Sequence, residues 1–162
     1  MSTELKLNMD GVFKGNYKKG GIGGIFRDKS GNCILGYKMP ACGYTSTYME
    51  LPALKSGLQI AKHHNFLSLE FETNATEIPQ LLSYNNYSLY SNLVNECKLL
   101  LKELENPLIR HNFREGNRLA HVLAMEGDKQ PSSTPLSAIF HPPDIFWNLI
   151  YRMTKLEHLL LD

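Results

Sequence analysis

The sequence predicts an α/β fold in which helices flank a mixed sheet, and three observations predict it. First, the early part of the chain holds three closely spaced segments with the two-residue hydrophobic period of strands, at 5–10, 21–27 and 32–39. Second, helix-like and strand-like segments alternate further along, which requires crossover connections and a partly parallel sheet. Third, 162 residues suit one globular domain and are too few for two complete ones.

The first three strands should form an antiparallel meander. Residues 5–10 alternate Leu, Lys, Leu, Asn, Met and Asp, so Asp10 points away from the apolar face of its strand. The segments 21–27 and 32–39 are separated by a polar turn that contains glycine, at 28–31, which is a hairpin signal. Such short connections place consecutive strands side by side and antiparallel.

Helices and strands then alternate. Apolar residues at 48–64 recur every three or four positions, as on one face of an amphipathic helix. We expect the later elements to be a strand, a short helix, a longer helix, a strand after the helix stop Pro107, and a final helix, at 67–73, 75–82, 93–104, 108–113 and 117–125. The expected sheet therefore has five strands, and the compact domain covers 5–125.

The composition changes beyond this domain. Proline and serine become frequent, which predicts a linker over 126–144. Residues 145–162 then carry an amphipathic helical stripe of Leu149, Met153, Leu156 and Leu160. This C-terminal helix either packs back on the domain or presents its apolar face to a protein partner.

The overall composition excludes several classes of protein. Hydrophobic residues make up 43% and charged residues 20%, which is typical of folded, globular chains. No apolar run reaches the roughly 20 residues that a membrane-spanning helix needs, and we expect an intracellular protein without a membrane partner. The three cysteines are widely spaced and lack a CxxC pair, which argues against a disulfide framework or a zinc knuckle.

The net charge of +1 limits how this chain could bind nucleic acid. A broad electrostatic grip on phosphates needs a strongly basic surface, so any nucleic-acid contact must be local. Basic residues gather in two places, in the first third of the chain and near the end of the core: Lys14, Lys18, Lys19 and Arg27, and then Arg110, Arg114 and Arg118.

Four motifs together resemble a known family. They are KLNMDG at 6–11, GGIFRD at 23–28, ELPAL at 50–54 with GL at 57–58, and HNFREGNRLA at 111–120. In this order and spacing the chain resembles the plant ribonuclease H-like, or reverse-transcriptase-like, domain over about residues 5–125. The resemblance implies a ribonuclease H-like fold with a five-stranded mixed sheet, and a family reaction in which metal-activated water hydrolyses the RNA strand of an RNA–DNA hybrid.

The same resemblance implies a set of site residues. Asp10 matches the family's metal-bridging aspartate and Glu50 matches its helix glutamate, so these two are the expected metal ligands. The third and fourth acid positions hold Asn74 and His121 instead. His111 matches the histidine that assists proton transfer or product release. We therefore expect Mg²⁺ or Mn²⁺ if the protein is active, or no metal at all.

Loss of two acids has a direct electrostatic consequence. Two hard cations carry four positive charges, and two carboxylates neutralise only half of them. The preceding acid, Glu72, lies about 6.6 Å from position 74 along a strand, too far to replace it without rearrangement. Pro52 removes a backbone donor near Glu50 and would shift it unless the helix begins there. We expect little cleavage and a degenerate, retroelement-derived active site.

A second function class remains open at this point. The chain could be a non-catalytic module that binds nucleic acid or protein, with Arg114, Asn117 and Arg118 contacting a nucleic-acid backbone. Arg114 and Asn117 could equally brace the turn that leads into the last helix. His121 could bind a softer metal such as Zn²⁺, or simply lie on the surface of its helix.

Overall fold

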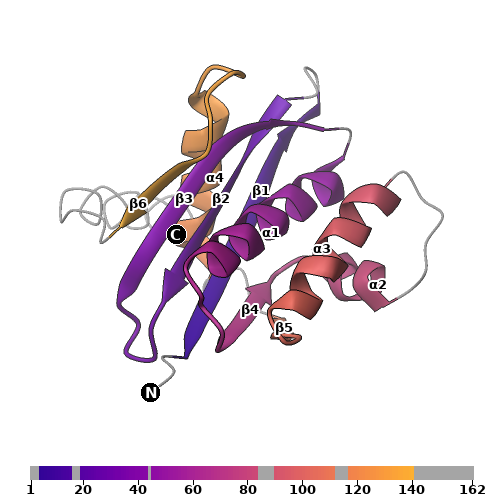
Figure 1. Ribbon diagram of the computed structural model, residues 1–162. Coiled ribbons are helices and arrows are strands. Elements are labelled where there is room, and N and C mark those ends of the chain that lie inside the picture. Colours follow the sequence, from indigo (N-terminus) through magenta and orange to yellow (C-terminus); the bar gives the residue numbers. More distant parts are fainter. Residues whose placement is uncertain (1–3, 16–18, 44, 84–89, 112–116, 141–162) are drawn as a thin grey trace, which may run out of the picture.

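The computed structural model describes residues 4–15, 19–43, 45–83, 90–111 and 117–140 (Figure 1). One mixed sheet of six strands runs through these residues in the order β5-β4-β1-β2-β3-β6. Helices α1, α2 and α3 lie on one side of the sheet and α4 lies on the other (Figure 1). The elements in chain order are β1 (Leu5–Lys14), β2 (Lys19–Arg27), β3 (Cys33–Cys42), α1 (Ser46–His63), β4 (Leu69–Thr73), α2 (Glu77–Ser83), α3 (Ser91–Glu103), β5 (Leu108–His111), α4 (Arg118–Lys129) and β6 (Ser137–Phe140).

The strand directions agree with the sequence prediction. β1, β2 and β3 are joined in antiparallel pairs, and Asp10 lies opposite Gly23 in the register of β1 and β2. β4 is parallel to β1, and β5 is parallel to β4. The α/β fold with a mixed sheet and a leading antiparallel meander is therefore confirmed.

The expected number of strands is wrong, because the sheet has a sixth strand. β6 pairs antiparallel with the outer edge of β3, within the range 126–144 that we assigned to a linker. The same range also contains the last turn of α4, which extends to Lys129. A four-residue strand is too short to show a clear two-residue period, and the neighbouring Pro131 and Pro135 read as linker composition. The expected helix at 145–162 lies outside the described residues, as does the protein contact that we predicted for it.

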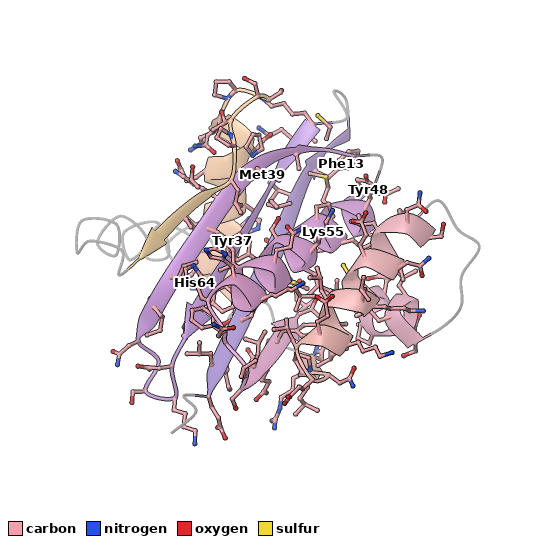
Figure 2. All side chains as sticks on the ribbon, viewed as in Figure 1. Phe13, Tyr37, Met39, Tyr48, Lys55 and His64 are labelled. Atoms are coloured by element: carbon pink, nitrogen blue, oxygen red, sulfur yellow. The ribbon has the colours of Figure 1, made fainter. Side chains whose placement is uncertain are left out.

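Apolar side chains between the sheet and α1 form the main core. Leu7 and Met9 of β1 are fully buried on this side, with Leu51, Leu54 and Leu58 of α1. Tyr37 of β3, labelled in Figure 2, donates its phenolic hydrogen to the backbone carbonyl of Ala53 at 2.7 Å. Burial raises the pKa of this phenol well above its ordinary value, so the hydroxyl remains a donor. The buried hydrogen bond fixes α1 on the sheet.

Glycines of β2 bring α4 unusually close to the opposite side. A Cβ added at Gly23 would lie 2.4 Å from the backbone nitrogen of Ala124, and one at Gly21 would lie 2.1 Å from the Ala124 carbonyl oxygen. Gly127 of α4 has the same relation to Met39 of β3, at 2.6 Å from its carbonyl oxygen. The backbones of helix and sheet are thus in direct contact, which fixes the second half of α4 on β2 and β3.

Among the helices in the described ranges, none is both long enough and apolar enough to cross a lipid bilayer.

Candidate functional site

A gap in the sheet beside β1 creates the candidate site. β4 pairs with β1 only as far as the Asn8–Glu72 register position, whereas β1 continues to Lys14. The backbone of β1 beyond Asn8 therefore needs partners other than β4 along this edge. Gly11 donates its N–H to Glu50 Oε1 at 3.2 Å, and the carbonyl of Met9 accepts from Asn117 Nδ2 at 2.7 Å. Side chains from α1 and α4 consequently meet at this edge.

Asp10 lies beside this gap and is paired with His121. The aspartate side chain is 8% exposed and the imidazole 44% exposed. His121 Nδ1 is 2.6 Å from Asp10 Oδ2, a distance typical of a charge-assisted hydrogen bond in which the imidazole N–H donates. This position of α4, predicted to have lost its acid, therefore brings a donor to the aspartate instead of a second negative charge.

Glu50 is a buried acid with an incomplete set of partners. Its side chain is 7% exposed, and Oε2 is buried without a hydrogen-bond partner among the described residues. Burial, followed by the negative charge of Asp10, raises the pKa of Glu50 to about 9. As a carboxylate, Oε2 has no donor to accept from. A proton shared with Asp10 relieves this, and a bound cation is the other way to relieve it.

The local sequence explains why α1 presents Glu50 here. Thr45 caps the helix by accepting from the N–H of Tyr48 at 3.0 Å. Gly11 lets the helix approach β1, because a Cβ at this position would lie 2.5 Å from the backbone carbonyl carbon of Met49. Pro52 lies inside the helix, which begins at Ser46 and not at Pro52. Glu50 keeps its place through the bond from Gly11.

Asn74 and His111 lie at the ends of the neighbouring strands β4 and β5. Asn74 is half-buried and directly follows β4, and His111 is exposed at the end of β5, where it is in register with Thr73. Glu72 is held by Lys6 Nζ at 3.2 Å and Asn8 Nδ2 at 2.9 Å, so it does not supply the acid missing at Asn74.

The three predicted nucleic-acid contacts differ in what the structure shows. Asn117 is 2% exposed and bonded to β1, which matches the bracing role that we considered for it and leaves its side chain no access to a ligand. Arg118 begins α4 and is half-buried. Arg114 lies outside the described residues.

Sequence reasoning missed one acid near the site. Glu77 begins α2, three residues after Asn74, and its negative charge contributes to the raised pKa of Glu50. The signal in the sequence was an acid near the start of the short helix expected at 75–82.

The donor set suits one hard cation better than two. Mg²⁺ and Mn²⁺ prefer carboxylate oxygens, and one such ion can be held by one or two carboxylates with water completing its shell. The unpartnered Oε2 of Glu50 and the carboxylate of Asp10 meet that requirement. In the described ranges, however, no three His, Cys, Asp or Glu side chains are gathered as ligands of one ion. A pair of divalent ions therefore does not fit these residues.

Known structures with the same fold support this description of the sheet and helices. An RNase H1 named LC11, isolated from compost by a metagenomic approach, superposes with a TM-score of 0.68 at 21% identity, covering 79% of this chain and 96% of that one. The N-terminal RNase H domain of rv2228c from Mycobacterium tuberculosis gives a TM-score of 0.69 at 16% identity, covering 78% and 99%.

A third similar structure is a foamy viral protease–reverse transcriptase in complex with double-stranded DNA. Its TM-score is 0.62 at 16% identity, and the match covers 79% of this chain and 94% of that one. A search of curated proteins gave no match.

A family model described as reverse transcriptase-like matches residues 8–127, which contain β1, α1 and most of α4. The matched residues include Asp10, Glu50 and His121. The chain belongs to the reverse transcriptase-like family of ribonuclease H-like domains.

Proposed function

We propose that this domain binds RNA–DNA hybrid or another nucleic-acid duplex and cleaves its RNA strand slowly or not at all. The observation that carries the proposal is the 2.6 Å bond between His121 Nδ1 and Asp10 Oδ2. The bridging acid of a two-ion site needs its oxygens for both ions, and here one oxygen is engaged by a side chain of the same protein.

The chemistry of the remaining groups agrees with weak hydrolysis. A cation held by Asp10 and Glu50 would supply a more acidic water and charge neutralisation at the phosphate. Glu50 itself opposes the binding of metal ions. It holds a proton up to about pH 9 and must release this proton to bind a cation. The site therefore favours occupation by protons over occupation by two ions at neutral pH.

Nucleic-acid binding is supported by the likeness to proteins of this fold. One LC11-RNase H1 structure is a complex with an RNA/DNA hybrid, at 20% identity and a TM-score of 0.68, and the foamy viral enzyme is bound to double-stranded DNA. With a net charge of only +1, binding here must depend on a few basic side chains and on salt concentration. Arg118 at the start of α4 is the described candidate closest in sequence to the site.

Cleavage is tested with a labelled RNA–DNA hybrid and either Mg²⁺ or Mn²⁺. We expect little product from the unmodified protein, and a gain of metal-dependent cutting in the double variant Asn74→Asp, His121→Asp, because it restores four carboxyl groups. The matched control is Asn74→Asp with Glu72→Gln, which leaves the total number of acids unchanged. Rapid cutting by the unmodified protein that is lost in Asp10→Asn would refute the proposal.

Binding is tested separately, by fluorescence anisotropy of the same hybrid in EDTA. We expect Arg118→Ala to weaken binding and to reduce its salt dependence by roughly one released counterion. Lys102→Ala, which removes an equal charge from the end of α3, serves as the control. Absence of any binding at low salt would rule out a nucleic-acid partner for this domain.

A further inference from the structure

The sheet face that carries α4 extends past that helix. On this side α4 contacts β1, β2 and β3, and its first turns lie beside Asp10. Because side chains alternate along a strand, the face that contains Asp10 and Gly23 continues towards the start of β1. Figure 1 shows this end of the sheet extending past α4. Five polar residues lie there, and we call them the polar face: Lys6, Asn8, Arg27, Glu70 and Glu72.

The polar face is more buried than an open sheet surface should be. Asn8 is 4% exposed, and the side chains of Glu70 and Glu72 are 22% and 15% exposed. Arg27 Nε is buried without a hydrogen-bond partner among the described residues, and burial lowers the pKa of its guanidinium. Charged side chains are rarely so buried unless another part of the structure covers them. The other described helices lie on the opposite side of the sheet, so the cover comes from elsewhere in the chain or from a partner.

The chain leaves the sheet next to this face. β6 ends at Phe140, opposite Leu35 of β3, and Cys33, two residues before Leu35, is opposite Arg27. Neighbouring strands lie about 4.8 Å apart, so β6 is about 19 Å from β4, four strands away. A helix over 145–162 would be about 27 Å long, because each residue adds about 1.5 Å. The segment that follows β6 is therefore long enough to cross the polar face.

The sequence of this segment suits the surface. Arg152 follows Leu149 by three positions and precedes Leu156 by four, so in a helix it shares the face of the apolar stripe. An arginine among apolar residues needs an acid opposite it, and β4 supplies Glu70 and Glu72. The stripe itself consists of Leu149, Met153, Leu156 and Leu160.

Apolar residues border the polar face on both sides. Ile25 of β2 is buried and in register with Asn8. Leu108 of β5 is in register with Glu70 and is 56% exposed. A helix that crosses the face therefore meets acids near its middle and apolar side chains towards its two ends.

We propose that residues 145–162 form a helix that covers the polar face of the same chain, with Arg152 directed at the acids of β4. The stripe is then buried within the domain, and a protein partner has no access to it. This inference goes beyond the proposed function, since the contacts form without nucleic acid.

The thiol of Cys33 reports whether the face is covered. It is half-buried opposite Arg27, and burial raises its pKa to about 11. Because thiols react as thiolates, uncovering Cys33 both admits the reagent and increases the reactive fraction. The experiment measures by mass spectrometry how fast iodoacetamide alkylates Cys33 in the full chain without nucleic acid. Cys42, which is exposed, is the internal reference.

Leu156→Asp places a charge in the stripe and should release the segment. We expect Cys33 to be alkylated at least about fivefold faster in this variant, with no change at Cys42. The matched control is His158→Asp, which adds the same charge about 200° further around the helix axis and should leave both rates unchanged. Arg152→Glu should accelerate Cys33 alkylation by a smaller factor, because it places a third acid against Glu70 and Glu72. Far-ultraviolet circular dichroism checks that each variant is folded.

Three results would overturn the inference. Equal Cys33 rates in Leu156→Asp and His158→Asp show that the segment does not cover this face. Equal acceleration at Cys33 and Cys42 shows that the whole domain has loosened. A Cys33 rate that falls as the protein concentration rises shows that the segment of a second copy provides the cover. Because the assay contains no nucleic acid, it can succeed while hybrid binding fails, and the two proposals are tested independently.

Discussion

Strand β1 and helix α4 are joined by two acid–base pairs that have the same length and different surroundings. At one end Asp10 of the strand lies 2.6 Å from His121 of the helix, and at the other Lys14 of the strand lies 2.6 Å from Asp128 of the helix. Both carboxylates are nearly buried, at 8% and 5% exposed. Only Asp10 has a second buried acid, Glu50, as a neighbour. One pair therefore links two elements, whereas the other belongs to a site with excess negative charge.

The difference separates a pair that links β1 to the end of α4 from a pair that belongs to the candidate site. The Lys14–Asp128 pair closes the end of the α4 interface where Gly21 and Gly127 allow backbone contact. The Asp10–His121 pair lies where β1 has no β4 neighbour, so its surroundings favour a ligand over a packed side chain. Substitutions at the α4 interface, at Glu50 and in the two pairs should therefore change the free energy of unfolding by different amounts, and not all in the same direction.

The largest expected effect is on the packing between the two pairs. In Gly23→Ala, the new methyl group would lie 2.4 Å from the Ala124 backbone nitrogen and 2.6 Å from Leu123 Cβ. Because these atoms cannot rotate away, α4 must shift, and we expect a loss of about 3 kcal/mol in the free energy of unfolding. Urea denaturation measures this loss.

A second glycine provides the control for this substitution. In Gly36→Ala the nearest atom is the side-chain methyl Leu123 Cδ1, at 3.3 Å, which can give way. We expect a loss below about 1 kcal/mol for this variant. Similar losses for Gly23→Ala and Gly36→Ala would show that α4 is not held by backbone contact with β2.

The next prediction concerns Glu50, the buried acid beside Asp10, and how protein stability depends on pH. Glu50 has a pKa of about 9 in the folded protein and an ordinary value of 4.5. The folded state therefore keeps a proton that the unfolded state has released, and stability falls as the pH rises from about 4.5 to 9. We expect a decrease on the order of 2 kcal/mol across this window, measured by thermal and urea unfolding.

Glu50→Gln tests the origin of that slope. The amide resembles the protonated acid and can still donate towards Asp10, so stability should become nearly independent of pH between about 5 and 8. If stability still falls with pH in this variant, other groups cause the pH dependence, and Glu50 does not hold a proton at neutral pH.

Much of the sheet, and the contact of Asp10 with His121, follow from local patterns in the sequence. Periodicity and short turns were sufficient for the three antiparallel strands. The alternation that follows predicted a partly parallel sheet, and β4 is indeed parallel to β1. Motif positions brought Asp10 and His121 into one site, where they are in contact. These features depend on local patterns of five to ten residues, which the sequence displays directly.

What could not be predicted depends on distant contacts. β6 forms because it pairs with the outer edge of β3, and its four residues show no pattern that predicts a strand. Asp128 lies in a segment with linker composition, although its carboxylate is buried against Lys14. The role of Asn117 remained undecided because its partner, Met9, is far away in the chain. Tertiary pairing across long separations decides all three cases.

The smallest effect directly compares the two pairs. Asp128→Asn removes the partner of Lys14, which is 67% exposed and stays hydrated, so we expect a loss of about 1 kcal/mol. Asp10→Asn also removes a buried charge, yet it relieves repulsion with Glu50 and leaves an amide oxygen for His121. At about pH 10, above the pKa of about 9 at which Glu50 releases its proton, it should raise stability by up to about 1 kcal/mol. Urea unfolding of both variants in parallel gives the sign of each change. If both variants lose stability equally, Asp10 has a structural role like that of Asp128, and Asp10 and Glu50 do not form a site with excess negative charge.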